Sequence, residues 1–87
     1  MFAPFQTILI SGGTGSLGQA LTRFLLDATD ATIRIMSRGE HRQAEMHATF
    51  QDDRIRYLIG DVRDYQRLLL ACHGVDVVIH AAALKRQ

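Results

Sequence analysis

Short apolar runs alternate with longer amphipathic stretches along this chain. Because the runs are short, rich in β-branched residues and bounded by glycine or polar turns, they are typical of strands buried on both faces of a sheet. We predict strands at residues 6–11, 31–37, 55–59 and 75–80. The stretches between them predict helices at residues 16–28 and 40–50, and a third from residue 65 to a stop at Gly74.

The predicted helices differ in how clearly their inward faces can be identified. The first has apolar residues at helical spacing, which we expect to face the sheet: Leu17, Leu21, Phe24, Leu25 and Ala28. The second is weakly amphipathic, and its expected inward residues are Ala44, His47, Ala48 and Phe50. In the third, we expect the Asp64 carboxylate to cap the amino end and Gly74 to close the carboxyl end in a left-handed conformation.

The order of elements, βαβαβαβ, indicates an α/β fold. Each connection is long enough for a helix to cross between parallel strands. Right-handed crossovers in a doubly wound, Rossmann-type parallel sheet predict the strand order 3-2-1-4. A complete fold of this type has further strands beside the fourth, so we expect the chain to be truncated before them. The fourth strand would then form an open apolar edge, which favours self-association or a homo-oligomer.

Composition places residues 1–87 in one folded domain. Hydrophobic residues make up 47% and charged residues 22% of the sequence, which is ordinary for a globular protein. The formal net charge is +1, and the interleaved basic and acidic residues indicate solvated faces and argue against a nucleic-acid partner. No run approaches the roughly 18 apolar residues of a membrane span. We therefore expect a cytoplasmic protein with no membrane segment.

Cysteine and histidine form no pattern typical of a disulfide or a metal site. Cys72 is the single cysteine, and we interpret it as a small buried helix residue. His41, His47 and His73 are spaced too irregularly for metal ligands. His80 is interpreted as a buried histidine with a hydrogen-bond partner rather than as a catalytic residue. We therefore assign no metal site.

The strongest chemical feature is a glycine-rich turn, G-x-x-G-x-x-G, between the first strand and the first helix. Gly12 would permit the tight turn, Gly15 would let a phosphate approach the backbone, and Gly18 would let the helix pack closely on the sheet. Free N–H groups and the positive end of the helix dipole would face a pyrophosphate. We predict a dinucleotide pyrophosphate site at Gly12, Thr14, Gly15, Ser16, Leu17 and Gly18.

The residues after the second strand bear on the choice of cofactor. An NAD site usually places Asp or Glu about 20 residues beyond the glycines, where it binds the ribose 2′-hydroxyl. Here the strand ends in Ser37 and Arg38, and Arg42 follows one turn further. A guanidinium binds a 2′-phosphate, whereas a carboxylate repels it. We therefore predict NADP in preference to NAD, although Glu40 places a carboxylate nearby. The alternative interpretation is that Arg38 and Arg42 are solvated surface charges.

Two further strand ends carry candidate cofactor contacts. Asp61 follows the third strand and would accept a hydrogen bond from the adenine amino group, with Val62 against the ring. An ordinary polar turn is the alternative interpretation of this segment. After the fourth strand, small residues would let the backbone run beside the cofactor ribose, and a lysine would reach a phosphate or a sugar hydroxyl: Ala81, Ala82, Ala83 and Lys85.

Four segments together resemble a known family: residues 10–18, 37–40, 60–64 and 80–85, with Glu45 and Met46 also fitting. The sequence resembles the N-terminal, NADP-binding part of the extended short-chain dehydrogenase/reductases. It is most similar to the inverting UDP-N-acetylglucosamine 4,6-dehydratases of the polysaccharide biosynthesis protein family. The glycine turn alone marks only the superfamily, and the combination with the other segments is more specific.

The resemblance implies NADP bound across the carboxyl ends of the strands and a UDP-sugar bound by a second domain. It implies oxidation at sugar C4 by hydride transfer to NADP⁺, loss of water across C5 and C6, and return of the hydride to C6. It also implies that the catalytic Tyr and Lys and the UDP-sugar pocket lie downstream of residue 87. We therefore assign no catalytic residue and expect no turnover from this polypeptide alone.

Two alternatives remain open on the sequence. The chain could be part of another extended reductase, such as a nucleotide-sugar epimerase or reductase, which shares the fold and the glycine turn. It could also be a non-catalytic nucleotide-binding or interaction module that pairs with a partner through its open strand edge.

Overall fold

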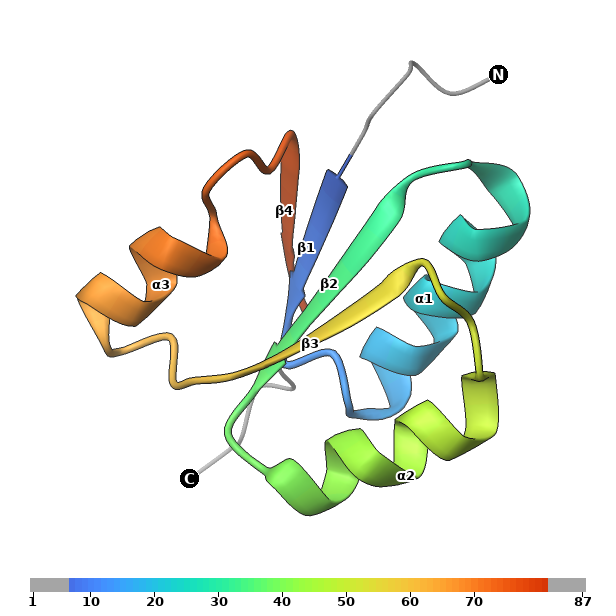
Figure 1. Cartoon of the computed structure of the whole chain (residues 1–87), viewed down its shortest axis with the longest axis horizontal. Helices are drawn as coiled ribbons and strands as arrows, with labels where there is room; N and C mark the ends of the chain where they lie inside the picture. The colour runs from blue at the N-terminus through green and yellow to red at the C-terminus, as the bar shows by residue number, and fades with distance from the viewer. Residues whose placement is uncertain (1–6, 82–87) are drawn as a thin grey trace.

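The computed structural model describes residues 7–81 and has the expected α/β architecture. A four-stranded parallel sheet separates α1 and α2, on one face, from α3 on the other (Figure 1). The elements are β1 (Thr7–Ser11), α1 (Ser16–Ala28), β2 (Thr32–Ser37), α2 (Glu40–Phe50), β3 (Ile55–Ile59), α3 (Tyr65–Ala71) and β4 (Val77–His80). The strand order β3-β2-β1-β4 confirms the predicted Rossmann-type topology.

The β1 strand lies inside the sheet, between β2 and β4, and is buried on both faces. Ile8, Leu9 and Ile10 are at most 2% exposed. Because side chains alternate along a strand, Ile8 and Ile10 pack in the cluster that includes α1 and α2, while Leu9 packs with Ala71 of α3. Burial on both faces explains why this strand is a continuous apolar run. It also places the end of β1, where the glycine turn starts, in the middle of the carboxyl edge.

The α1 helix is rotated relative to the sequence prediction. Its buried residues are Gly18, Thr22 and Leu25. Leu17, Phe24 and Ala28 were predicted to face the sheet, and this was wrong because all three are exposed. Leu25 is buried and Leu21 packs against the core, as predicted, so the prediction was right for part of the face. Gly18 also belongs to this face because it packs closely on the turn.

The inward face of α2 also differs from the prediction. Its buried residues are Gln43 and Met46, while Ala44, His47 and Ala48 are exposed, so those three expectations were wrong. Phe50 is partly buried against the core, as predicted. Hydropathy could not identify Gln43 as an inward residue because its amide is buried by virtue of its hydrogen bonds, which are described below.

Two arginines that the charge pattern assigned to solvated faces instead bind the carboxyl ends of helices. Arg54 donates from Nη1 to the Thr29 carbonyl and from Nη2 to the Leu26 carbonyl, both at 2.6 Å, at the end of α1. Arg34 of β2 donates from Nη1 to two backbone carbonyls at the end of α3, at 2.7 and 2.8 Å. These carbonyls have no intrahelical donor, so each arginine satisfies acceptors that the helix leaves open.

The ends of α3 and β4 shift by a few residues from the prediction. The Asp64 side chain caps α3 as expected, accepting a backbone hydrogen bond from the first turn at 3.1 Å. Gly74 is left-handed as expected, with φ at 74°. The helix itself ends at Ala71, so Cys72 is its half-buried C-cap rather than a buried helix residue. The β4 strand begins at Val77, two residues later than predicted.

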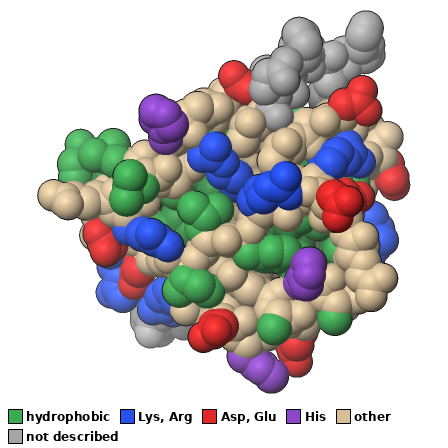
Figure 2. Space-filling model, in the orientation of Figure 1, with side chains coloured by type: hydrophobic (Ala, Val, Ile, Leu, Met, Phe, Trp, Pro, Cys, Tyr) green, Lys and Arg blue, Asp and Glu red, His purple; other side chains and the backbone are tan. Residues whose placement is uncertain are grey.

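Charged side chains of both signs are interspersed over the face seen in Figure 2, and hydrophobic side chains gather over α3 at the left of the view. The exposed large apolar residues of α3 and β4 are Tyr65, Leu69, Leu70 and Val78. No helix within residues 7–81 is long and apolar enough to cross a membrane.

Candidate cofactor-binding site

The glycine turn joins β1 to α1 at the carboxyl edge of the sheet. Gly12 is left-handed, with φ at 69°, and its N–H donates to the Met36 carbonyl at 2.8 Å, which ties the turn to β2. A Cβ on Gly18 would lie 2.4 Å from the Gly13 Cα, so the helix packs on the turn itself. A Cβ on Gly15 would meet only the Gly12 carbonyl oxygen, at 3.8 Å. The space beside Gly15 is what a phosphate approaching the backbone requires.

The amino end of α1 has no side-chain cap. Gly15 occupies the N-cap position, and no side chain accepts a hydrogen bond from the first turn there. The Gln19 amide donates to the Thr14 carbonyl at 2.8 Å and holds the turn against the helix. Ser16 and Leu17 are exposed in the first turn. The first N–H groups of a helix have no intrahelical acceptor and lie at its positive end, so this arrangement fits an anionic phosphate.

A buried glutamine joins the ends of β2 and β3. The Gln43 amide donates to Ser37 Oγ at 2.9 Å and to the Leu58 carbonyl at 2.8 Å. The Gly60 N–H donates to the Ser37 carbonyl at 2.9 Å, which draws the same two strand ends together. Sequence reasoning identified Ser37 but missed Gln43. The signal was its spacing with Met46 and Phe50, which places all three on one side of α2.

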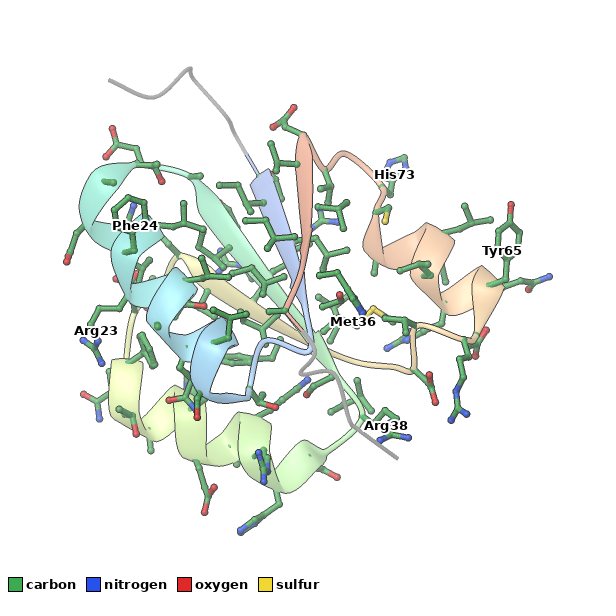
Figure 3. All side chains as sticks on the ribbon, turned by 180° about the vertical axis from the view of Figure 1, so that it is seen from behind. Arg23, Phe24, Met36, Arg38, Tyr65 and His73 are labelled. Carbon is green, nitrogen blue, oxygen red and sulfur yellow. The ribbon has the colours of Figure 1, made fainter. Side chains whose placement is uncertain are left out.

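The segments that follow β2 and β3 bring three charged side chains together. Arg38 lies at the end of β2 (Figure 3), with Nη1 3.9 Å from Asp61 Oδ2. Arg63 lies closer, with Nη2 2.8 Å from the same oxygen and Nε 3.2 Å from both carboxylate oxygens. Hydrogen bonds from the Arg63 side chain and backbone, with the positive charges of both arginines, lower the pKa of Asp61 to about 2. Arg63 was not among the predicted site residues.

Two other predicted residues do not join this cluster. Arg42 is exposed on α2, and within residues 7–81 no hydrogen bond or ion pair connects it to Arg38 or Asp61. Val62 follows Asp61 directly and is exposed. The structure thus brings Arg38 and Asp61 together, and leaves Arg42 and Val62 exposed outside that pair.

The end of β4 contributes a serine–histidine hydrogen bond. His80 Nδ1 lies 2.5 Å from the Oγ of Ser11, whose residue is 2% exposed. The expected hydrogen-bond partner of His80 is confirmed, but its expected burial was wrong because the residue is exposed. Ala81 is buried, and its N–H donates to the Ser11 carbonyl at 2.8 Å. The remaining predicted contacts lie outside the described residues: Ala82, Ala83 and Lys85.

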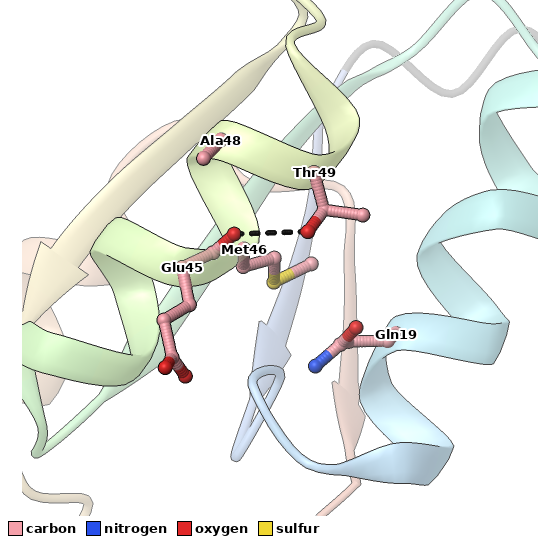
Figure 4. Close-up of a pocket in the computed structure, with 5 residues that line it drawn as sticks. All are labelled: Gln19, Glu45, Met46, Ala48 and Thr49. Atoms are coloured by element: carbon pink, nitrogen blue, oxygen red, sulfur yellow. Dashed lines mark hydrogen bonds between the residues drawn. The ribbon is translucent and has the colours of Figure 1, made fainter.

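A separate groove of about 500 Å³ lies between α1 and α2 (Figure 4). It is lined by Gln19, Glu45, Met46, Ala48 and Thr49. None of these is a predicted cofactor contact, and the one hydrogen bond drawn there, from Thr49 Oγ1 to the Glu45 carbonyl, is local to α2. The groove nevertheless borders the glycine turn through Gln19, whose amide donates to the Thr14 carbonyl. Within the described part of the chain, no group of His, Cys, Asp or Glu residues is arranged to hold a metal ion.

The curated relatives of this chain include proteins named as enzymes of UDP-sugars. The chain is 51% identical over 81 residues to a UDP-N-acetylglucosamine 4,6-dehydratase (inverting) of Campylobacter jejuni, covering 92% of this chain and 24% of that protein. It is 48% identical over 85 residues to a UDP-glucose 4-epimerase of Rickettsia felis, covering 93% of this chain and 25% of that protein. The chain thus spans about a quarter of the length of these relatives.

Solved structures share the fold, and the sequence matches one family over nearly its whole length. The structure of Pen from Bacillus thuringiensis matches with a TM-score of 0.90 and 39% identity, over 99% of this chain and 27% of that one. A short-chain dehydrogenase/reductase from Veillonella parvula in complex with NADP matches with a TM-score of 0.72 and 26% identity, over 87% and 35%. Residues 8–87 match the family described as polysaccharide biosynthesis protein. The chain therefore belongs to this polysaccharide biosynthesis protein family, within the extended short-chain dehydrogenase/reductases.

Proposed function

We propose that this chain binds NADP at the carboxyl edge of its sheet. The observation that carries the proposal is the uncapped amino end of α1 beside Gly15, together with the Arg38 guanidinium at the end of the adjacent strand β2. The first feature fits a pyrophosphate and the second fits a 2′-phosphate. The relative from Veillonella parvula, which is described as a complex with NADP, supports the same cofactor.

The residues that would bind the cofactor lie at the carboxyl ends of four strands. The turn from Gly12 to Gly18 would bind the pyrophosphate through backbone N–H groups. Ser37, Arg38 and Arg42 would bind the 2′-phosphate, with Gln43 holding the Ser37 hydroxyl in place. Asp61 and Val62 would contact the adenine, and the segment from Ala81 to Lys85 the ribose. When bound, NADP⁺ supplies a hydride acceptor at its nicotinamide ring.

We propose further that this domain serves a nucleotide-sugar 4,6-dehydratase acting on UDP-N-acetylglucosamine in polysaccharide biosynthesis. The family match over residues 8–87 and the 51% identity to the Campylobacter enzyme support this assignment. A UDP-glucose 4-epimerase is the second candidate, since the Rickettsia felis relative is 48% identical. Both candidates take a UDP-sugar, so the choice between them concerns the sugar and the reaction rather than the nucleotide.

Calorimetric titration of the 87-residue chain with NADP⁺ and, separately, with NAD⁺ tests the cofactor proposal. We expect NADP⁺ to bind more tightly, and Arg38→Ala to reduce NADP⁺ affinity by roughly tenfold, because a charge-assisted contact to the phosphate contributes about 1–3 kcal/mol. The same substitution at Arg23, on α1, is the control and should leave binding unchanged. A folded chain that binds neither dinucleotide would contradict the proposal.

A pair of chimeras tests the reaction class. Residues 7–81 replace the matching segment in the Campylobacter dehydratase and, separately, in the Rickettsia epimerase. The downstream host residues then supply the rest of each enzyme. We expect the dehydratase chimera to retain turnover of UDP-N-acetylglucosamine and the epimerase chimera to lose most of its turnover. Retention by the epimerase chimera alone would favour the second candidate.

A further inference from the structure

The carboxylate of Asp61 is shared unequally between two arginines from different segments. Arg63 follows Asp61 by two residues and binds both of its carboxylate oxygens, and the Arg63 backbone N–H donates to Oδ1 at 2.9 Å. Arg38 comes from the end of β2, and its nearest nitrogen is 3.9 Å from Oδ2. Both guanidinium groups are largely exposed, whereas the Asp61 side chain is 29% exposed. The carboxylate is therefore the least exposed group of the cluster and the one that both arginines contact.

A carboxylate at this place creates a difficulty for a 2′-phosphate. An unpaired Asp61 would repel a phosphate dianion bound at Arg38, and it would also compete with that phosphate for the Arg38 guanidinium. Both effects would favour NAD over NADP. The arrangement found here avoids them, because the nearest cation to Asp61 is Arg63 and not Arg38.

We propose that Arg63 is a positioning residue that determines cofactor specificity: by occupying the Asp61 carboxylate, it leaves the Arg38 guanidinium available for a 2′-phosphate. This inference rests on the proposed binding of NADP. Arg63 itself need not touch the cofactor. Its effect comes from neutralising Asp61 and holding the carboxylate in place, where an oxygen with a remaining lone pair would accept a hydrogen bond from adenine.

Local geometry explains why Arg63 holds the carboxylate in preference to Arg38. The turn after β3 is closed by the Asp64 N–H, which donates to the Asp61 carbonyl at 2.8 Å. Asp61 and Arg63 therefore sit in one tight turn, and pairing them orders few additional torsions. Arg38 would have to reach across from another loop. Removing the Arg63 charge should let Arg38 close that gap.

Titrations with both dinucleotides test the inference through the ratio of the NADP⁺ and NAD⁺ affinities. For Arg63→Gln we expect this ratio to fall by roughly two- to fivefold, the range that a largely exposed charge interaction allows. Arg63→Lys keeps the charge but loses the two-oxygen geometry, so it should lie between Arg63→Gln and the parent chain. Adding Asp61→Asn to Arg63→Gln should restore the ratio, although adenine binding weakens for both cofactors.

Arg23→Gln removes one positive charge from α1, away from this cluster, and should leave the ratio unchanged. A ratio that is equally unchanged in Arg63→Gln would overturn the inference while leaving the NADP proposal intact. Absence of any NADP⁺ preference in the parent chain would instead overturn the proposed 2′-phosphate contact, and this inference with it.

A pH titration of Asp61, observed by NMR of its carboxyl group, tests without any cofactor whether Arg63 shields Asp61 from Arg38. If Arg63 shields Asp61, then Arg38→Gln should raise the pKa of Asp61 more in the Arg63→Gln background than in the parent chain. Circular dichroism checks that each variant is folded. An equal effect of Arg38→Gln in both backgrounds would show that Arg63 does not shield Asp61, and would overturn the inference even if no dinucleotide binds.

Discussion

The glycines of the turn are required for different physical reasons. Gly12 adopts a left-handed φ, which costs other residues roughly 1–2 kcal/mol. Gly18 lies against the Gly13 backbone, where no side chain fits. Gly15 has ordinary extended torsions, φ −78° and ψ 179°, and open space beside it. The fold itself therefore does not require glycine at position 15, and we propose that the approach of a ligand does.

Alanine substitutions separate these roles. We predict that Gly18→Ala lowers the free energy of unfolding by about 1–3 kcal/mol, because its Cβ overpacks the turn. Gly15→Ala should leave stability within about 0.5 kcal/mol, since its conformation suits alanine, and should instead weaken NADP⁺ binding. Urea unfolding and calorimetry measure the two effects. Equal destabilisation by both substitutions would refute this division.

At the scale of elements, arginine side chains from outside the helices donate hydrogen bonds to the carbonyls at the carboxyl ends of two helices. Arg54 and Arg34 each donate twice to carbonyls that end α1 and α3. These bonds join segments that are 25 to 39 residues apart, so they depend on the sheet having formed. The helices are short, and short helices depend on such tertiary contacts more than on their own propensity.

Replacing Arg54 tests this dependence. We predict that Arg54→Met lowers the free energy of unfolding by about 1–3 kcal/mol, because two carbonyls at the end of α1 lose a charged donor. The methionine keeps most of the aliphatic packing. Arg56→Met on the exposed side of β3 is the matched control and should change stability by less than about 0.5 kcal/mol. The midpoint of urea unfolding distinguishes the two.

At the scale of the whole molecule, apolar surface is concentrated beside one edge of the described sheet. The β4 strand pairs with β1 on one side only, and Val78 is 53% exposed. Leu69 and Leu70 of α3 are exposed on the same face of the sheet, and Tyr65 points outward from α3 in Figure 3. An exposed strand edge next to apolar side chains is a template for pairing with another chain.

We predict that the 87-residue chain self-associates as its concentration rises. Val78→Lys should shift this association to higher concentration by placing a charge on the edge strand. Phe24→Lys introduces the same charge on α1, across the sheet, and should have the smaller effect. Sedimentation velocity over a range of concentrations measures both. A parent chain that stays monomeric throughout would refute the prediction.

The elements themselves could be predicted from the sequence because their signals are local. Apolar runs ended by glycine or polar residues mark the four strands, and the stretches between them mark the three helices. The right-handed crossover rule then orders the strands. The helix faces could not be predicted in the same way. Gly18 and Gln43 are buried because of what lies opposite them, a turn in one case and two hydrogen-bond acceptors in the other.

The candidate site, too, has a part that the sequence predicted and a part that only the folded structure shows. By itself, the sequence determined the glycine turn, the arginine after β2 and the aspartate after β3, since each belongs to a short motif at the end of a strand. Only the tertiary structure decided that Arg38, Asp61 and Arg63 form one cluster, and that Arg63 is the closer partner of the carboxylate. The physical reason is that the pairing of parallel strands brings together strand ends that are distant in the sequence. Which charges interact depends on the distances between them, and these are set only when the sheet has formed.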